Sequence, residues 1–161
     1  MDIRPLTGPH RGVVLRHILE EWGDPIVTRG RAIDVRGLPG FAALDGAQPA
    51  GAVLYEIRDG ECEIVVLYSD LEGRGAGTAL IAAVVGEAQR HGCARVWLIT
   101  MNDNTHAIRF YQRRGFDLKA VHLNAFEVTR RMKREPPCET VYGIDGIPIR
   151  HEFEFEIVLP G

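Results

Sequence analysis

Residues 70–80 read DLEGRGAGTAL, with glycine at every second position from Gly73 to Gly77. A helical pattern follows directly, and its apolar face is formed by Leu80, Ile81, Val84, Val85 and Ala88. Glycine is favoured where the backbone must turn sharply or come very close to another group. A strand, a glycine-rich turn and a helix in succession favour an anion site, because free amide N–H groups converge at the helix N-terminus.

Two common phosphate-binding loops do not fit these letters. A Walker A loop needs a lysine after its last glycine, and no lysine follows any of these glycines. A Rossmann loop, G-x-G-x-x-G/A, would place Thr78 or Leu80 at its last small position. The loop must therefore be of a different kind.

A second motif follows at residues 102–116, which read NDNTHAIRFYQRRGF. The spacing predicts a helix with Asn104 as its N-cap and Gly115 at its end. Residues 94–101, ARVWLITM, lie between the two motifs and are apolar at alternating positions of both faces. That pattern is typical of a strand covered on both sides.

Together the two motifs resemble those of the GCN5-related N-acetyltransferases, the GNAT family. Its pyrophosphate loop is usually written [Q/R]-x-x-G-x-[G/A], and Gly75 and Gly77 match its glycine positions. Glu72 stands where that family has Gln or Arg, and Arg74 resembles a displaced form of the family's arginine. The family's later segment is matched at its spacing by Asn104, Ala107, Tyr111, Gly115 and Phe116. The resemblance covers roughly residues 50–123 well.

This resemblance implies that the chain binds acetyl-CoA as cosubstrate. The amides that would hold the CoA pyrophosphate belong to Gly73, Arg74, Gly75, Ala76, Gly77 and Thr78. Leu67 and Tyr68 would pair with the pantetheine arm, and Asn104 and Ala107 would contact the CoA arm. We expect Glu72 to point outward, because a carboxylate would repel a pyrophosphate. A plain tight turn at the glycines and a purely structural cap at Asn104 are the alternatives.

The family position of Tyr111 implies that its hydroxyl protonates the leaving thiolate, since a phenol with a pKa near ~10 is protonated at neutral pH. A core aromatic without a catalytic role is the alternative. Glu63 is the first candidate for the general base, and Glu154, His122 and Tyr68 are the other candidates. The row formed by Glu152, Glu154 and Glu156 is most simply interpreted as a solvated sheet face, with the phenylalanines between them facing inward.

The length of 161 residues predicts a single domain over residues 1–161. We expect an α/β fold with a mixed, mostly antiparallel sheet of about six or seven strands, flanked by helices. Residues 10–22 predict a helix, and residues 50–57 and 62–69 predict a hairpin around the turn Arg-Asp-Gly. Residues 26–42 give no clear pattern, and residues 124–150 are too long for an ordinary loop.

The composition argues against several classes of binding partner. A formal net charge of −3 argues against nucleic acid, and no apolar stretch predicts a membrane span or a secretory signal. Cys62, Cys93 and Cys138 form no framework or metal motif, which favours a reducing cytoplasmic setting without a bound metal. The leading hypothesis is an N-acetyltransferase for an amine of a small molecule or peptide, with a homodimer as a possibility. The alternatives are a non-catalytic acyl-CoA-binding module and a nucleotide-binding protein.

Overall fold

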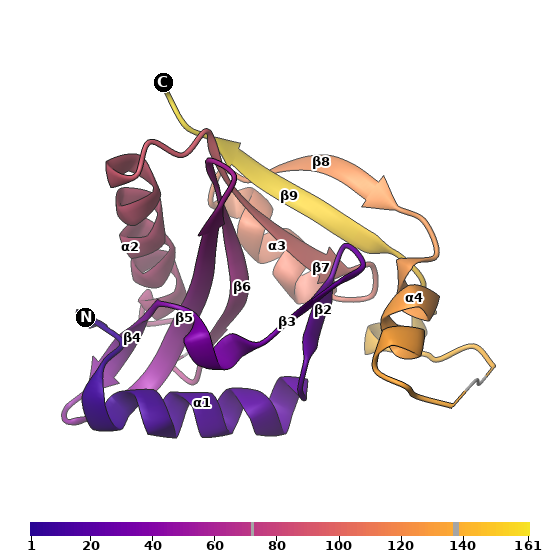
Figure 1. The fold of residues 1–161 in the computed structure, drawn as a ribbon, viewed down its shortest axis with the longest axis horizontal. Helices are drawn as coiled ribbons and strands as arrows, with labels where there is room; N and C mark the ends of the chain where they lie inside the picture. Colours follow the sequence, from indigo (N-terminus) through magenta and orange to yellow (C-terminus); the bar gives the residue numbers. More distant parts are fainter. Residues whose placement is uncertain (72, 137–138) are drawn as a thin grey trace. The chain divides into compact units, whose positions relative to one another are not determined.

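The computed structural model describes residues 1–71, 73–136 and 139–161 (Figure 1). Seven strands belong to the main sheet, which is mostly antiparallel, and four α-helices accompany it. The expected fold class is therefore confirmed. The chain forms two compact units: Met1–Asp24, Asp34–Val96 and Val158–Gly161 make the first, and Pro25–Ile33 and Trp97–Ile157 make the second.

The first unit contains the strands and helices around the glycine-rich loop. Its elements are β1 (Asp2–Pro5), α1 (Gly8–Trp22), the short 3-10 helix η1 (Val35–Gly37), β4 (Gly40–Asp45), β5 (Gln48–Arg58), β6 (Glu61–Ser69) and α2 (Ala76–Arg90). The four strands follow the order β1-β4-β5-β6, and each pairs antiparallel with the next. Helix α2 packs against β4, β5 and β6, and α1 packs against β5.

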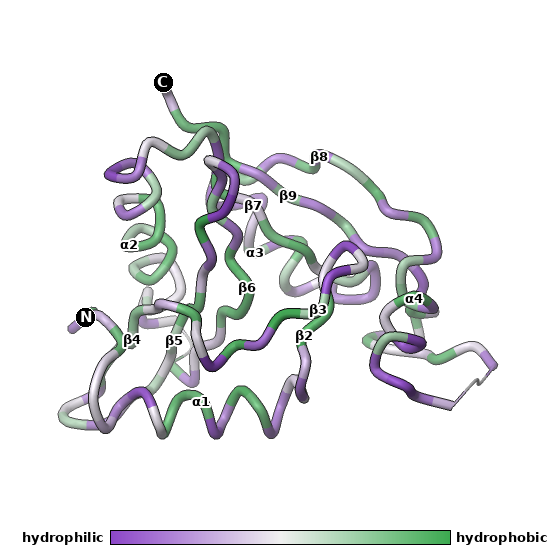
Figure 2. Tube along the Cα trace, viewed as in Figure 1, coloured by the Kyte–Doolittle hydropathy of each residue, from purple (hydrophilic) through white to green (hydrophobic). Residues whose placement is uncertain are grey.

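Amphipathic patterns explain both helices of this unit. Apolar residues recur once per turn along α1 between hydrophilic ones (Figure 2), and Val14 and Ile18 are fully buried. In α2 the predicted apolar positions Leu80, Ile81 and Val84 are buried. Gly92, with φ 67°, follows the last turn of α2 and ends the helix as expected.

The hairpin of β5 and β6 also forms as predicted. Its two-residue turn is Asp59 and Gly60, with φ values of 54° and 74°. Two successive left-handed residues are typical of the type I′ turn, whose twist matches that of the flanking strands. This hairpin leads β6 directly toward the glycine-rich loop.

The second unit contains the family-like helix and the C-terminal strands. Its elements are β2 (Ile26–Thr28), β3 (Arg31–Ile33), β7 (Arg95–Met101, which begins at the end of the first unit), α3 (Thr105–Arg113), β8 (Asp117–His122), α4 (Ala125–Met132), the 3-10 turn η2 (Ile144–Gly146) and β9 (Glu152–Val158). Its sheet strands follow the order β7-β9-β8, and β8 and β9 are antiparallel. Strands β2 and β3 form a separate small sheet that packs near α4.

Two regions without a clear sequence pattern are regular in the structure. Residues 26–33 form the β2–β3 hairpin, which was not predicted, and residues 125–132 form helix α4 (Figure 1). Asp103 fixes the segment after α4, because its Oδ2 accepts the N–H of Ile144 at 3.1 Å. Among the described residues, no helix is long and apolar enough to cross a membrane.

Candidate active site

The glycine-rich loop enters α2 through left-handed backbone. Gly73 has φ 70°, and Gly75, the N-cap residue of α2, has φ 75° and ψ 11°. A Cβ atom at either glycine would meet no atom within 4 Å. These two positions therefore favour glycine for its backbone freedom, and the space beside them is open to a ligand.

Helix α2 begins with amide groups outside its hydrogen-bond ladder. Within that ladder, the N–H of Ala79 donates to the carbonyl of Gly75 at 3.0 Å. The amides of Ala76 and Gly77 precede Ala79 in the first turn, where helical N–H groups lack partners inside the helix. Within the described part of the chain, no side chain caps this end. The loop and the helix dipole together suit an anion such as a pyrophosphate.

Arg74 is the cation of this loop. Its side chain is 56% exposed, and its Nη1 lies 3.7 Å from Oδ2 of Asp45, which is equally exposed. Exposed ion pairs of this kind contribute little to stability. Arg74 can therefore exchange Asp45 for a bound anion at small cost. Glu72, which we expect to point outward, lies outside the described residues.

Strand β6 carries a bulge before the residues expected to contact pantetheine. Its register with β5 shifts between Leu54, opposite Val66, and Tyr55, opposite Ile64. Val65 is therefore an extra residue, which disrupts the ladder locally and bends the strand. Leu67 and Tyr68 follow the bulge, where the pairing with β5 is regular again.

Tyr68 packs in an aromatic cluster with α1. Its ring centroid lies 4.4 Å from that of His17 and 5.9 Å from that of Trp22. Burial, together with the nearby carboxylate of Asp70, raises the pKa of Tyr68 to about 12. The phenol therefore stays protonated at neutral pH, so its basic form is not available to accept a proton.

Glu63 is almost completely buried in β6. Its exposed fraction is 3%, and it lies opposite Glu56 of β5. It precedes the bulge, whereas Leu67 and Tyr68 follow it. Buried carboxylates need compensating partners, so the burial of Glu63 suits both a general base and a structural group.

In the second unit, Asn104 caps helix α3 as predicted. Its Oδ1 accepts the N–H of Ala107 at 3.1 Å. The preceding Asn102 also has a structural role, since its Oδ1 accepts the N–H groups of Arg150 and His151 at 2.8 and 2.9 Å. The run Asn-Asp-Asn thus fixes both the start of α3 and the segment before β9.

Tyr111 lies in α3 among three phenylalanine rings. The ring centroids of Phe110, Phe116 and Phe155 lie 5.2, 5.4 and 6.5 Å from its own. Tyr111 is 9% exposed, and burial raises the pKa of its hydroxyl above the usual value. A protonated phenol in this setting can serve as a proton donor and is a poor base.

The prediction of a solvated glutamate row on β9 is wrong. Glu152 is 1% exposed and Glu154 is 3% exposed, whereas Val158 at the strand end is 69% exposed. The β2–β3 hairpin is the physical reason, because its turn residue Arg29 donates its N–H to Oε1 of Glu152 at 3.2 Å. His122 adds a contact of 2.9 Å from its Nε2 to Oε1 of Glu154.

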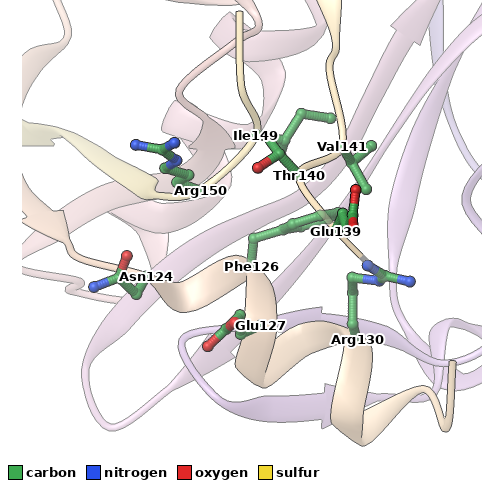
Figure 3. Close-up of a pocket in the computed structure, with 9 residues that line it drawn as sticks. All are labelled: Asn124, Phe126, Glu127, Arg130, Glu139, Thr140, Val141, Ile149 and Arg150. Carbon is green, nitrogen blue, oxygen red and sulfur yellow. The ribbon is translucent and has the colours of Figure 1, made fainter. Parts of the chain in front are cut away.

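A pocket of about 200 Å³ lies in the second unit (Figure 3). Charged side chains of both signs surround an apolar middle, and Phe126 of α4 extends into it. The lining residues are Asn124, Phe126, Glu127, Arg130, Glu139, Thr140, Val141, Ile149 and Arg150. All of these residues belong to the segment 124–150, which the sequence showed to be too long for an ordinary loop. In the described ranges, no group of three or more His, Cys, Asp or Glu side chains could hold a metal ion.

Comparison with known proteins shows to which family this chain belongs. The acetyltransferase (GNAT) family model matches residues 13–116, which include the glycine-rich loop and Tyr111. The chain belongs to the GNAT acetyltransferase family. The uncharacterised protein YdhI of Bacillus subtilis (strain 168) is 39% identical over 153 residues, which cover 91% of this chain and 94% of that protein.

Solved structures confirm the GNAT fold. A Bacillus subtilis acetyltransferase in complex with CoA is similar with a TM-score of 0.71 and 18% identity, over 98% of each chain. The IAA acetyltransferase from Bacillus cereus ATCC 14579 has a TM-score of 0.73 and 21% identity, over 98% of this chain and 100% of that one. At these identities the likeness concerns the fold.

The sequence of this GNAT chain did not indicate Arg29, which lies beside the two buried glutamates of β9. Arg29 is the turn residue of the β2–β3 hairpin, with φ 49°, and it contacts both buried glutamates. The only local signal was the pair Arg29-Gly30, since glycine often follows a left-handed turn residue. No local sequence pattern indicates that Glu152 and Glu154 of β9 are buried.

Proposed function

We propose that this GNAT-family chain transfers an acetyl group from acetyl-CoA to a primary amine of a small molecule or a protein. The amine attacks directly in a ternary complex. The observation that carries the proposal is the left-handed loop at Gly73 and Gly75, which leads into the N-terminus of α2, an end that no side chain of the described residues caps. A solved GNAT structure of similar fold contains CoA, which supports the choice of cosubstrate.

The proposed CoA contacts involve the glycine-rich loop, strand β6 and the start of α3. The pyrophosphate would be held by the amides of Gly73, Arg74, Gly75, Ala76, Gly77 and Thr78. The backbone of Leu67 and Tyr68 would pair with pantetheine, and a backbone N–H there would stabilise the negative charge that develops on the thioester oxygen. Asn104 and Ala107 would contact the CoA arm. We also propose that residues 1–161 act as one catalytic domain.

The proposed reaction uses two side chains of this chain. The neutral amine nitrogen attacks the thioester carbonyl carbon, a C–N bond forms, and the nitrogen gives up its extra proton to Glu63. The C–S bond then breaks, and the leaving thiolate takes the proton of the Tyr111 hydroxyl. Tyr111 is the proposed donor because its hydroxyl is protonated at neutral pH and so carries the proton that the thiolate needs.

The free cysteines support the proposed location. Cys62 and Cys93 are both reduced and buried, and burial raises the pKa of Cys62 to about 12. Unpaired thiols are typical of reducing compartments. We therefore propose that the enzyme works in the cytoplasm.

The test is release of free thiol from acetyl-CoA across an amine panel, with wild type compared with Tyr111→Phe. We expect wild type to acetylate at least one amine and Tyr111→Phe to lose about 10²–10⁴-fold in kcat with unchanged CoA affinity. Tyr142→Phe is the matched control, since Tyr142 is 66% exposed. CoA binding without acetylation of any amine would instead favour the non-catalytic module.

A further inference from the structure

The turn between β4 and β5 lies beside the start of the glycine-rich loop. Strand β4 ends at Asp45, directly before this turn. Farther along β5, Gly51 lies opposite Ser69, the last residue of β6. The loop begins after Ser69, and the N–H of Asp70 donates to the carbonyl of Ala50 at 2.7 Å. The turn and the loop therefore lie at the same end of these strands, within the first unit.

Main-chain contacts hold Asp45 in place at this turn. Asp45 pairs in register with Gln48 of β5, so that only Gly46 and Ala47 lie between the two strands. Gly46 has φ 63°, which suits a tight turn. Nε2 of His10 in α1 lies 3.1 Å from the carbonyl oxygen of Ala47 and links the turn to that helix. The Asp45 carboxylate therefore extends from a fixed backbone.

The side chain of Asp45 reaches the cation of the glycine-rich loop. Its Oδ2 lies 3.7 Å from Nη1 of Arg74, and both side chains are 56% exposed. Within residues 1–71, 73–136 and 139–161, neither side chain has a second ion-pair partner. A separation of 3.7 Å is too long for a hydrogen bond, so charge attraction alone holds the pair.

This pairing affects the anion that the loop would bind. The pyrophosphate of CoA would accept short, charge-assisted hydrogen bonds from the Arg74 guanidinium, which are stronger than an attraction without a hydrogen bond. Because no hydrogen bond fixes its direction, Asp45 does not orient the guanidinium toward a phosphate. The negative charge of Asp45 also opposes a second anion beside the same cation. Asp45 therefore favours the free protein over the CoA complex.

Building on the proposed function, we propose that Asp45 competes with the pyrophosphate of CoA for Arg74. Asp45 is then a positioning residue that acts through Arg74. It holds the guanidinium in the free protein and weakens the binding of acetyl-CoA and CoA alike, since both carry the pyrophosphate. An exposed ion pair contributes little, so the expected effect on affinity is about twofold to fivefold.

The first experiment compares two aspartates by calorimetry with CoA at low ionic strength. Asp45→Asn keeps the shape of the side chain and removes its charge. Asp59→Asn is the matched control, because Asp59 lies in the turn between β5 and β6 and its Oδ2 is also 3.7 Å from an arginine, Nη1 of Arg58. Asn tolerates the φ of 54° at Asp59. We expect Asp45→Asn to bind CoA about twofold to fivefold more tightly, and Asp59→Asn to bind it like wild type.

A double-variant cycle shows whether Asp45 acts through Arg74. Arg74→Gln removes the cation, so adding Asp45→Asn to it should leave CoA affinity unchanged. An equal gain in both backgrounds would assign the effect to direct repulsion between Asp45 and CoA, and would overturn the competition. Weaker CoA binding in Asp45→Asn alone would mean that Asp45 orients Arg74 for the phosphate, which would overturn it as well.

Salt and a conservative variant separate this role from a structural one. The gain of Asp45→Asn should disappear at about 1 M salt, where the Debye length falls to about 3 Å. Asp45→Glu, which keeps the charge, should bind CoA like wild type. The Tm of Asp45→Asn should stay close to that of wild type, because exposed ion pairs contribute little to stability. A gain that persists at high salt would contradict the competition.

CoA binding and acetyl transfer test separate claims here. The expected CoA affinities without acetylation of any amine would leave the competition standing and refute the enzyme. Acetyl transfer together with an unchanged CoA affinity in Asp45→Asn would refute the competition and leave the enzyme standing.

Discussion

The loop before α2 and the segment before β9 both contain a glycine that the structure favours over other residues, but for different physical reasons. Gly75 has φ 75°, and a Cβ there would meet nothing within 4 Å. Gly143 has φ −104°, which any residue can adopt, but a Cβ there would overlap Oδ2 of Asp103 and lie 2.6 Å from its Cγ. The first position needs a backbone conformation, and the second needs the absence of a side chain.

This difference explains why the role of Gly75 could be predicted from the sequence and that of Gly143 could not. A glycine needed for its backbone conformation lies in a local run between a strand and a helix. The residues next to Gly75 in the sequence are therefore enough to predict its role. The neighbour of Gly143 comes from the Asn-Asp-Asn run, and the bond from Ile144 to Asp103 spans 41 residues. Substitution of Gly75 should therefore lower CoA affinity, whereas substitution of Gly143 should lower the stability of the protein.

Among the substitutions that compare these two regions, Gly75→Val is expected to have the largest effect. A β-branched residue is strongly disfavoured at φ 75°, and strain of this kind costs about 1–3 kcal/mol before the loss of the close approach to phosphate is added. We expect CoA affinity, measured by calorimetry, to fall by about a hundredfold. Gly75→Asn, which tolerates left-handed backbone, should retain most of it. Equal loss in both variants would contradict the conformational explanation.

Gly143→Ala should act on stability rather than on CoA. The added methyl group forces Asp103 away from the N–H of Ile144, and such overpacking costs about 1–3 kcal/mol. Urea unfolding measures this loss, with CoA affinity as the second readout. The double variant Gly143→Ala/Asp103→Gly should regain part of the stability. If the double variant is less stable than the single one, the overlap is not the cause.

Asn104→Ala tests the two interpretations of that residue. Loss of the cap contact to Ala107 should lower the free energy of unfolding by about 1 kcal/mol. Asn104→Asp keeps the capping oxygen and places a negative charge near the proposed CoA arm. We expect it to restore stability but not CoA affinity. Full recovery of both would assign Asn104 a purely structural role.

Gly86→Ala is expected to have the smallest effect, and a favourable one. Gly86 lies within α2, and a Cβ there would lie 3.8 Å from Nη1 of Arg90, which is ordinary contact. Alanine in a helix interior is favoured over glycine by about 0.5–1 kcal/mol. The Tm should rise slightly with CoA affinity unchanged. A loss of CoA affinity would show that α2 responds to substitution far from its N-terminus.

Local patterns accounted for much of the fold. The hairpin of β5 and β6 with its turn at Asp59 and Gly60 and the helices α1 and α2 all formed as predicted. The β2–β3 hairpin was missed because its strands have only three residues each, too few for a period to emerge. Helix α4 was missed because it spans only Ala125–Met132, about two turns, which is shorter than the stretch over which a helical period is recognised.

The candidate site was predictable to a similar degree. The cap at Asn104 is confirmed, and the expected CoA and catalytic residues stay predictions. The glutamates of β9 were misjudged because alternation distinguishes two faces but does not reveal what covers each of them. Arg29, which covers Glu152, is 123 residues away in the sequence. Contacts of that separation depend on the tertiary fold.

The most direct test of the central claim is an NMR titration of the labelled protein with CoA, in which the backbone amide shifts are followed. We predict saturable binding with the largest changes at residues 73–78, and smaller ones at residues 67 and 68. Amides at the N-terminus of α2 should respond because they donate to the pyrophosphate. Saturable CoA binding that leaves residues 73–78 unchanged would contradict the account.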